Sequence, residues 1–492
     1  MTTQLRARSV LAGAPHVVAL LITAPLFATL PQQSFAVGSS ENAFRAGAAK
    51  VDITPPVSAL FSGDSIRDHL YVRAIVVDNG HTCVALVSLD QANLTKDMVS
   101  KGVAGASAAI HCPAENFLVS ATHTHSGGVG ILDAQTLPSH DELAAAIVQS
   151  VERAHAQMRP ASIGFGTTSV YLNVNRDLYE HDKWYQGPNP AGPADKTLAV
   201  IAFIGADHYP IAYYFDYAMH PINFYLSGVI SGDFPGQASR YLEQRYAGGT
   251  VALFGQGASG DVFPLLTGPM QKLLGRRTRT AGFDDERFGA DDPWKVGSMM
   301  KNSNDEQVAQ MRTPIRPEER SAYEEAIAQD GALVAAEGTL LGESVIDVFK
   351  HDMGTSIDRG VLWSGQERLT CPGRDRIDST AREGARPAYK DIDPVSLTVG
   401  LIRLGDIYIA SIDGEVYTNI WTHVKRDVPV SKLMMVGLAG GQANSGYIYS
   451  DDAGSHLTFE VIGSHLKPGC AENKIVDAVR TLINSANSLP SR

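Results

Sequence analysis

The 492-residue sequence predicts a mixed-sheet α/β (α+β) fold in which helices flank the sheet. Apolar runs of strand length are interspersed with helical segments, and hairpin signals such as Asn79-Gly80 join neighbouring runs. A composition of 44% hydrophobic and 19% charged residues is typical of a globular protein with a sizeable core. The sequence shows no internal repeat, and its length allows either two to four average domains or one large α/β unit.

The first half of the chain predicts most of the strands, at 48–54, 71–78, 82–89, 117–120, 198–204 and 211–217. The strand at 48–54 is short and stops at two prolines, so we expect it at an edge of the sheet. A helix begins at Ser139, where Glu142 completes a capping box. Its apolar face, formed by Leu143, Ile147 and Val151, is expected to cover a sheet.

The second half predicts helices at 237–246, 320–337 and 475–483, and strands at 251–255, 397–404, 407–412 and 433–438. Residues 267–318 carry clusters of arginine and acidic residues with no clear period. We expect this stretch to be a surface insertion. Both a lid over the functional site and a plain surface decoration are open interpretations.

The N-terminus predicts export. Arg6 and Arg8 form a positive segment, an apolar stretch follows at 10–30, and small residues around Ala36 match a cleavage site. A membrane anchor is the competing interpretation, but two prolines interrupt the apolar stretch. We therefore predict a signal peptide over 1–36, one domain over 37–492, and a secreted or periplasmic protein.

The net charge of −12 argues against a nucleic-acid-binding protein, because phosphate backbones require a clustered positive surface. It leaves a transient contact with a membrane surface open, since a local basic patch escapes a net count. The four cysteines are Cys83, Cys112, Cys371 and Cys470. In an exported protein they allow one or two disulfides, but no spacing indicates a cysteine metal site. Cys83, inside an apolar run, is predicted to be a buried free thiol.

Two histidines form the strongest local motif, His123 and His125 in the segment Ser-Ala-Thr-His-Thr-His-Ser-Gly-Gly at 120–128. In an extended chain, side chains two residues apart point to the same side. The pair lies where a strand runs into a Gly-rich loop, and imidazole is a frequent zinc ligand. The motif predicts one or two metal ligands, and a hydrogen-bonded pair of loop histidines is the alternative.

Further polar residues follow other predicted strands. His220 follows the strand at 211–217, as a ligand or as a strand-end histidine. Glu415 follows the strand at 407–412, where it would complete a His/His/Glu zinc set or remain a solvated carboxylate. Tyr447 is open to three roles, as a core aromatic, a substrate contact or a phenolate ligand. Asp233 is interpreted as a cap of the following helix.

The stretch Gly-Gln-Gly-Ala-Ser-Gly at 255–260 matches GxGxxG, but it leads into an irregular Arg-rich region instead of a helix and a second strand. It is therefore not interpreted as a dinucleotide site. Ser259 does not lie in a GxSxG elbow. A serine esterase or amidase that uses Ser259 remains an alternative.

Taken in order, these segments resemble the neutral/alkaline (non-lysosomal) ceramidase family, as a divergent bacterial-type member. The matching pieces are the Ser-Ala-Thr-His-Thr-His-Ser-Gly loop at 120–127, Asn175-Arg176, His220, the Gly-Asp-Val-x-Pro turn at 260–264, Gly414-Glu415 and Gly446-Tyr447. The opening Ala-Lys-Val-Asp-Ile-Thr-Pro-Pro at 49–56 is similar too. The His-Thr-His loop is the most specific of these motifs. The other segments support the resemblance because they occur in the same order as in the family.

The resemblance implies a neutral-ceramidase-type domain over 37–492 that cleaves the amide bond of an N-acyl substrate with a zinc-activated water. It implies one Zn²⁺ per chain, held by His123, His220, Glu415 and Tyr447. It also implies that His125 and Arg176 face the substrate carbonyl and stabilise the oxyanion. Either His125 or Asp261 would pass a proton to the leaving amine.

Three departures from the family pattern affect the expected substrate. Phe263 stands where ceramide-cleaving members carry serine, and this excludes a serine nucleophile at that turn. Phe459 stands where the family has a second tyrosine, and we expect no C-terminal β-sandwich domain of the kind that ceramidases often append. The expected substrate is therefore a ceramide-like lipid or an N-acyl amino acid or amine. An exported lipid- or metal-binding protein that has lost catalysis is the non-enzymatic alternative.

Overall fold

The structure is a computed structural model that describes residues 42–60, 64–128, 137–225, 227–247, 249–266, 268, 317–318, 320–377 and 384–488. The predicted signal peptide lies outside these residues, as does almost all of the predicted insertion at 267–318. Within the described part, no helix combines the length and the apolar composition that crossing a membrane requires.

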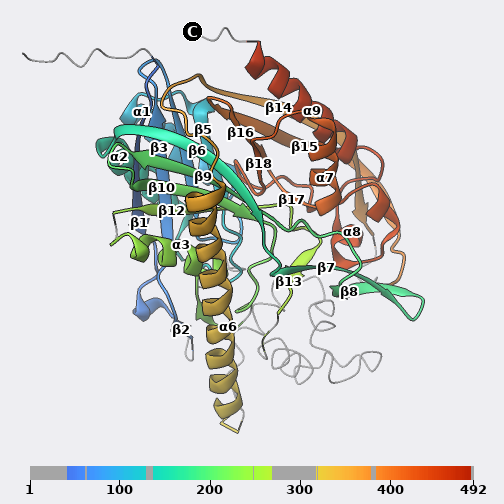
Figure 1. The fold of residues 1–492 in the computed structure, drawn as a ribbon. Helices are drawn as coiled ribbons and strands as arrows, with labels where there is room; N and C mark the ends of the chain where they lie inside the picture. Colours follow the sequence, from blue (N-terminus) through green and yellow to red (C-terminus); the bar gives the residue numbers. More distant parts are fainter. Residues whose placement is uncertain are drawn as a thin grey trace, which may run out of the picture. The chain divides into compact units, whose positions relative to one another are not determined.

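A large sheet forms the centre of the fold (Figure 1). Its strand order is β12-β10-β9-β6-β1-β3-β4-β5. The strands are β1 (Arg45–Asp52), β3 (Tyr71–Asp78), β4 (Cys83–Leu89), β5 (Phe117–Ala121), β6 (Arg159–Ser169), β9 (Thr197–Gly205), β10 (Pro210–Tyr217) and β12 (Val251–Gln256). The β4–β5 and β10–β12 pairs are parallel, and the other neighbours are antiparallel.

A smaller sheet packs on one face of the large one. Its order is β14-β15-β16-β18, from β14 (Leu362–Arg376), β15 (Tyr389–Leu404), β16 (Ile407–Ile412) and β18 (Leu433–Val436). Alternate residues of the facing strands interleave in one core cluster; Leu86 and Ile201 of the large sheet and Ile409 and Met434 of the small sheet belong to it. The two sheets therefore form the inner layers of the domain.

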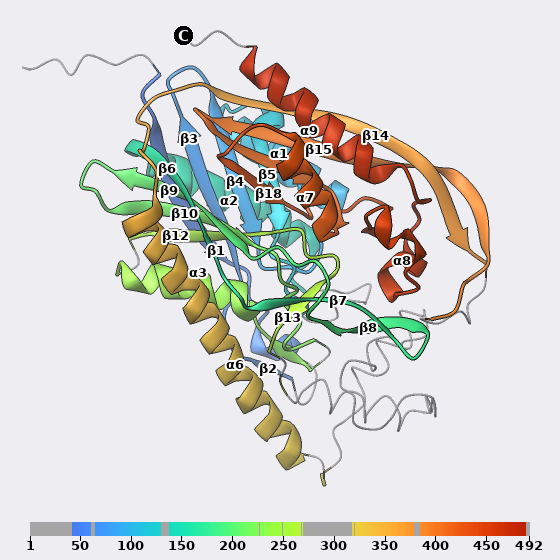
Figure 2. The same cartoon turned by 45° about the vertical axis from the view of Figure 1, so that its right-hand side comes forward.

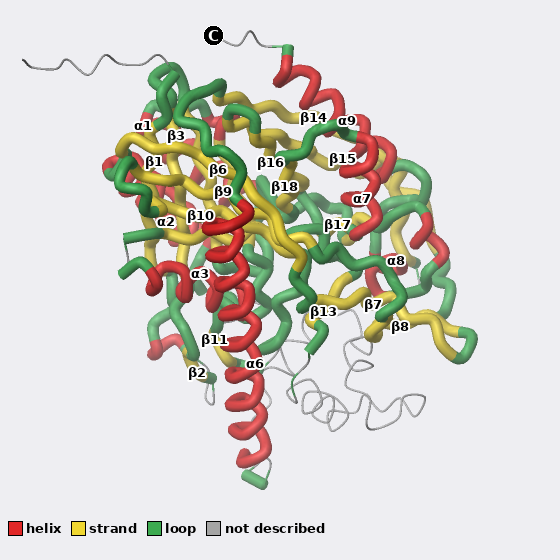
Figure 3. Tube along the Cα trace, viewed as in Figure 1, coloured by secondary structure: helices red, strands yellow, loops and turns green. Residues whose placement is uncertain are grey.

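Helices cover the outer faces of both sheets (Figures 2 and 3). The outer face of the large sheet packs against α1 (Lys96–Ile110), α2 (His140–Ala156), α3 (Asp233–Arg245) and α6 (Arg320–Asp347). The outer face of the small sheet packs against α7 (Thr418–Asp427) and α9 (Ala471–Asn487). The predicted mixed-sheet α/β class with flanking helices is confirmed, in the form of four layers.

Short elements complete the fold. The strands are β2 (Ser65–Ile66), β7 (Asn173–Glu180), β8 (Lys183–Asn189), β11 (Val229–Ile230), β13 (Val262–Pro264), β17 (Glu415–Val416) and β19 (Tyr447–Ile448). The helical elements are η1 (Val57–Ala59), η2 (Ala114–Asn116), η5 (Val348–Asp352), η6 (Asp452–Ser455) and α8 (Phe459–Gly463). They form the pairs β11–β2 and β17–β19 and the sheet β13-β7-β8.

Most predicted elements are present, with shifted ends. The capping box at Ser139 is formed, and Leu143, Ile147 and Val151 are buried as predicted. The helix predicted at 237–246 begins at Asp233, which is its first residue and not a side-chain cap of it, because Gly232 occupies the N-cap position. The first strand, predicted at an edge, lies between β3 and β6 because Ala46 and Ala48 pack against the small sheet while Ala49 packs against the helices.

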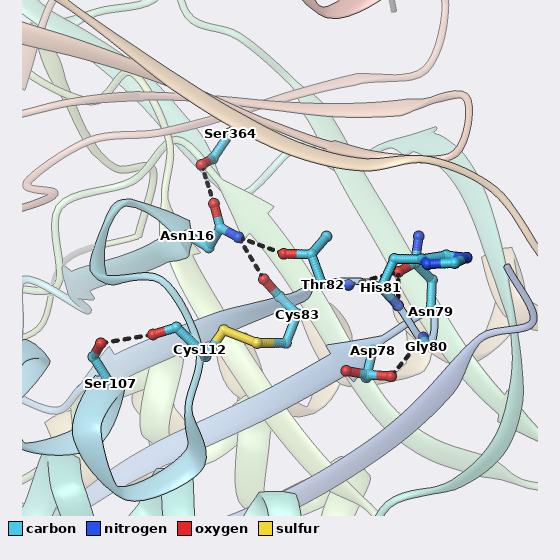
Figure 4. The surroundings of a disulfide bond; sticks show 10 residues. All are labelled: Asp78, Asn79, Gly80, His81, Thr82, Cys83, Ser107, Cys112, Asn116 and Ser364. Carbon is cyan, nitrogen blue, oxygen red and sulfur yellow. Dashed lines mark hydrogen bonds between the residues drawn. A yellow bond between two sulfur atoms is a disulfide. The ribbon is translucent and has the colours of Figure 1, made fainter. Parts of the chain in front are cut away.

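The prediction of a free thiol at Cys83 is wrong. Cys83 forms a disulfide with Cys112, with the Cα atoms 5.6 Å apart, and Cys371 forms a second one with Cys470. The start of β4 and the chain after α1 meet where Asn116 donates its side-chain amide to the Cys83 carbonyl at 2.8 Å (Figure 4). The Ser107 hydroxyl donates to the Cys112 carbonyl at 2.6 Å. The apolar sequence around Cys83 reflects the core beneath the bond and carries no information about its partner.

Candidate metal centre

The predicted site residues follow the carboxyl ends of strands in both sheets. His123 follows β5, His220 follows β10, Asp261 follows β12, and Glu415 follows β16. Backbone hydrogen bonds join these ends: Gly437 donates to Gln256 at 2.7 Å, and Ala121 donates to Leu438 at 3.3 Å. The carboxyl ends of parallel strands are the usual place for a site in an α/β sheet. Here the packing of two sheets brings together residues from four separate strand ends.

The backbone at His123 adopts a left-handed conformation with φ of 68°. This conformation is uncommon for a residue other than glycine and occurs mainly where the surroundings enforce it. The His123 N–H donates to the Gln91 carbonyl at 2.9 Å, and the Gln91 side-chain amide donates to the Gly127 carbonyl at 2.6 Å. The loop after β4 therefore fixes the turn that directs the His123 ring.

Three acceptor atoms converge at the centre of the site. The Nε2 atoms of His123 and His220 are 3.1 Å apart, and they lie 3.1 and 3.2 Å from Oε2 of Glu415. His123 Nδ1 lies 2.8 Å from the Ala92 carbonyl, and His220 Nδ1 lies 2.8 Å from the Ser259 carbonyl. A carbonyl can only accept, so each Nδ1 carries the proton and each Nε2 of the neutral ring presents a lone pair. Two lone pairs and a carboxylate oxygen thus face one another.

This donor set fits a divalent cation. Burial and the positive charge of Arg176 lower the pKa of His220 to about 3, so protonation of its ring at neutral pH does not relieve the repulsion. Nitrogen and oxygen ligands of a tetrahedral zinc ion lie about 2.0–2.1 Å from the metal and hence about 3.3 Å from one another. The measured separations of 3.1–3.2 Å are close to that value. The two backbone carbonyls fix the ring tautomers in the way that outer partners of metal ligands do.

Tyr447, the fourth predicted ligand, lies beside the other three. It is the register partner of Glu415 in the parallel pair β17–β19, and its ring stacks at 6.4 Å from the His220 ring. Burial, followed by the charge of Glu415, raises the pKa of Tyr447 well above its usual value. A cation at the cluster would favour the phenolate and so lower the pKa of Tyr447.

His125 lies next to His123 and His220. Its Nε2 is 3.4 Å from Nε2 of His123, and its backbone N–H donates to the Pro221 carbonyl at 3.1 Å. His123, His125 and His220 all place a ring nitrogen within 4.8 Å of one another. Burial, followed by the two neighbouring imidazoles, lowers the pKa of His125 well below 6.5, so the ring is neutral at neutral pH.

Arg176 forms the wall of the site next to Tyr447. Its guanidinium donates to the Gly260 carbonyl at 2.6 Å, and its Nε lies 2.7 Å from the Glu460 carboxylate. The guanidinium carbon is 5.4 Å from the Tyr447 ring centroid and 5.1 Å from that of Phe263. Glu460 was not predicted, although a lone carboxylate in the short run Thr-Phe-Glu-Val-Ile was a usable signal.

Asp261 is buried, and its carboxylate is hydrogen-bonded to the surrounding framework. Thr418 donates to Oδ1 through both its N–H and its hydroxyl, at 2.8 Å each, and Asn175 donates to Oδ2 at 3.1 Å. These bonds tie the loop after β12 to the start of α7 and to β7. They occupy the oxygens that a proton shuttle would need, so the geometry favours His125 over Asp261 for that role.

Asp261 is expected to make stability depend on pH. Burial, followed by the charge of Asp177, raises the pKa of Asp261 from 3.8 to about 8. A raised folded-state pKa stabilises the fold below the unfolded value and loses that effect as the pH rises through the folded value. We therefore expect the unfolding midpoint of the wild type to fall as the pH rises from about 5 to about 8. In the Asp261→Asn variant this fall should be smaller in scanning calorimetry, and an equal fall in both proteins would contradict the assignment.

Ser259 has no catalytic base among the described residues. Its hydroxyl accepts from the Gln256 side chain at 2.5 Å and is buried, and the nearest histidine, His220, contacts its carbonyl oxygen. This arrangement does not support the serine-hydrolase alternative. Phe263, in β13, is buried under the Arg176 guanidinium, so that turn carries no nucleophile.

The sequence of this region matches a known family. Residues 44–286 match the family model described as neutral/alkaline non-lysosomal ceramidase, N-terminal. The chain belongs to this family.

Other family members are distant in sequence. Neutral ceramidase B of Dictyostelium discoideum is 28% identical over 216 residues, which cover 38% of this chain and 29% of that protein. Neutral ceramidase of Pseudomonas aeruginosa is 25% identical over 345 residues, which cover 64% of this chain and 50% of that protein. These matches span about a third to a half of the length of these curated ceramidases.

The ceramidase fold is also found among solved structures. The crystal structure of neutral ceramidase from Pseudomonas aeruginosa superposes with a TM-score of 0.63 at 16% identity, covering 91% of this chain and 75% of that chain. A ceramidase complexed with C2 gives a TM-score of 0.63 at 15% identity, covering 92% and 76%. At these identities the likeness establishes the fold, which extends well beyond the matched residues 44–286.

Proposed function

We propose that this ceramidase-family chain is a zinc-dependent amidohydrolase that cleaves the amide bond of an N-acyl substrate. The observation that carries the proposal is the convergence of two imidazole lone pairs and the Glu415 carboxylate within 3.2 Å. Membership of the ceramidase family supports an amide as the bond that is cleaved. A ceramide-like lipid and an N-acyl amino acid or amine are the candidate substrates.

The residues divide into ligands and substrate contacts. His123, His220 and Glu415, with Tyr447 as a fourth ligand, would hold one Zn²⁺ per chain. Bound there, the ion would supply a water activated near neutral pH and polarise the carbonyl. The neutral His125, whose Nε2 lies 3.4 Å from Nε2 of His123, would act as the general base of the site and return the proton to the leaving amine.

Arg176 is the candidate for holding the developing negative charge. Its guanidinium is kept rigid by Glu460 and by the Gly260 carbonyl, so little reorganisation is needed during the reaction. The same contacts keep the charge buried at the edge of the site next to Tyr447. A fixed cation in a water-poor wall stabilises an oxyanion more strongly than a solvated one.

The proposal predicts chelator-sensitive amide hydrolysis. Fatty-acid release is measured from ceramide and from an N-acyl amino acid of the same chain length, before and after dialysis against a zinc chelator. We expect release from at least one substrate, its loss with the metal, and its return when zinc is added. Activity that persists after complete removal of zinc would exclude the proposed mechanism. Bound zinc without turnover of either amide would favour the non-catalytic binding protein.

We also propose that the protein is exported and cleaved near Ala36, as the charged and apolar pattern of its first 36 residues predicts. Expression in a bacterium with intact secretion should give a mature protein that begins near Val37, as read by N-terminal sequencing of the periplasmic or culture fraction. Changing Ala36 to a bulky residue should leave the longer precursor. Recovery of the uncleaved chain in the cytoplasm would contradict export.

A further inference from the structure

A histidine and a buried carboxylate form a pair beside the proposed site that the proposed mechanism does not use. His456, between η6 and α8, places Nδ1 2.7 Å from Oδ2 of Asp177 on β7. The Asp177 side chain is 4% exposed and the His456 side chain is 22% exposed. The pair therefore spans from the interior to an accessible surface.

The orientation of the His456 ring is fixed. It stacks on the Trp184 ring with centroids 3.7 Å apart and planes 20° from parallel. Since Nδ1 is directed at a carboxylate, it carries a proton. Its hydrogen bond to Asp177 is the one that this ring makes within the described part of the chain. The opposite nitrogen, Nε2, is thus left for a ligand.

Contacts between β7 and the 456–460 segment place the pair next to the reaction site. Consecutive residues of β7 bind the segment: Arg176 pairs with Glu460, and Asp177 pairs with His456. Arg176 also lies over the Tyr447 ring, which is the register neighbour of Glu415. Figure 2 shows α8, which follows His456, alongside the β7–β8 hairpin. The wall that begins at the metal cluster therefore continues outward to His456.

His423 and His69 also pair with carboxylates but lack this combination. His423 uses both ring nitrogens, on Glu472 at 2.8 Å and Asp427 at 3.1 Å, and holds two helices together. His69 pairs with Asp52, but both side chains are largely exposed, at 63% and 44%. His456 differs from both, since it has a buried carboxylate partner, an open nitrogen and an aromatic support.

We propose that His456, oriented by Asp177 and Trp184, binds a hydroxyl group of the substrate outside the scissile amide and so selects hydroxylated substrates. This inference rests on the proposed amidohydrolase function and adds a specificity-determining residue to it. A neutral ring accepts a hydrogen bond at Nε2, and a protonated ring donates one there. A hydroxyl group can donate to the neutral ring and accept from the protonated ring. The contact therefore survives a change in the protonation of the ring.

The surroundings disfavour a carboxylate as the bound group. Asp177 and Glu460 are both acidic and lie along this wall, and the Arg176 guanidinium is already paired with Glu460. A substrate carboxylate at His456 would lie close to these like charges. An N-acyl amino alcohol fits the wall better than an N-acyl amino acid.

The experiment compares substrates that differ by one hydroxyl. Values of kcat/KM are measured for N-dodecanoyl ethanolamine and N-dodecanoyl propylamine with zinc-loaded wild type and the His456→Phe variant. Phenylalanine keeps a ring against Trp184 and removes Nε2. We expect the variant to lose about tenfold in kcat/KM on the ethanolamide. It should change less than about twofold on the propylamide, mainly through KM.

Matched variants separate selectivity from folding. His423→Phe removes a histidine that also pairs with carboxylates, and it should leave the ratio of the two substrates unchanged. His456→Gln, which restores a side chain able to hydrogen-bond a hydroxyl, should recover part of the preference. An equal loss on both substrates, or no loss on either, would overturn the proposal.

The experiment distinguishes failure of the proposed amidohydrolase function from failure of the hydroxyl contact at His456. Wild type that cleaves neither amide would contradict the amidohydrolase function and not the hydroxyl contact itself. Calorimetric titration of the zinc-loaded protein with the ethanolamide then decides, because His456→Phe should weaken binding about tenfold. Equal affinities in wild type and variant would overturn the assignment of His456.

Discussion

Replacing His123 by alanine is expected to remove both the bound zinc and the amidase activity. The variant deletes one of the three atoms that converge within 3.2 Å, and alanine has no donor atom to replace it. Losing the activated water and the polarised carbonyl should cost several kcal/mol of transition-state stabilisation, a fall of at least about 10³-fold in kcat/KM. Metal content by elemental analysis and fatty-acid release measure the two effects.

A matched control for this variant is His423→Ala. His423 is a part-buried histidine on α7 that, like His123, contacts a carboxylate, but its partners are Asp427 and Glu472 and not a residue of the cluster. It should keep one zinc per chain and near wild-type activity. Full activity of His123→Ala with zinc still bound would refute the metal assignment.

Of the substitutions proposed here, replacing Arg73 by methionine is expected to cause the largest loss in the free energy of unfolding. Arg73 is buried on β3, and its guanidinium donates to Glu243 at 2.9 Å and to Asp90 at 2.8 Å. Methionine would leave two buried carboxylates without their shared cation, which typically costs about 3–5 kcal/mol. Chemical unfolding followed by circular dichroism measures the change in the free energy of unfolding.

The same substitution should also weaken metal binding. Asp90 precedes Gln91, whose carbonyl accepts from the backbone of His123. Arg159→Met is the matched control, because Arg159 pairs with Asp207 at 3.4 Å on the exposed surface and such pairs contribute about 0–1 kcal/mol. Equal destabilisation by the two variants would show that the buried network does not carry the stability assigned to it.

Much of the fold could be predicted because local sequence decides it. The Asn79-Gly80 turn defines the β3–β4 hairpin, and the Ser139–Glu142 capping box defines the start of α2. The missed elements had weaker local signals. The helix α1 is rich in glycine and alanine, and β6 begins Arg-Pro-Ala-Ser, so neither shows a clear apolar period. The position of β1 was wrong because local sequence does not reveal which strands flank a strand.

The site shows a similar division. The His-Thr-His segment indicates metal chemistry by itself, since residue type and spacing are enough to suggest imidazole ligands. Glu415, 292 positions from His123, has no local feature that separates a ligand from a solvated carboxylate. Its assignment as a metal ligand came from the resemblance to the ceramidase family. Glu460, Asp177 and His456 entered only through their contacts in the folded chain.

The sequence by itself therefore determined the mixed α/β class, the capped and hairpin-forming elements, and the types of residue available for chemistry. Those properties depend on side chains a few positions apart, which interact whatever the rest of the chain does. The tertiary structure decided which residues meet. The packing of two sheets joined strand ends far apart in sequence, paired Cys83 with Cys112, and committed the Asp261 oxygens to Thr418 and Asn175. Such contacts arise from burial of two complementary faces, and no short segment encodes them.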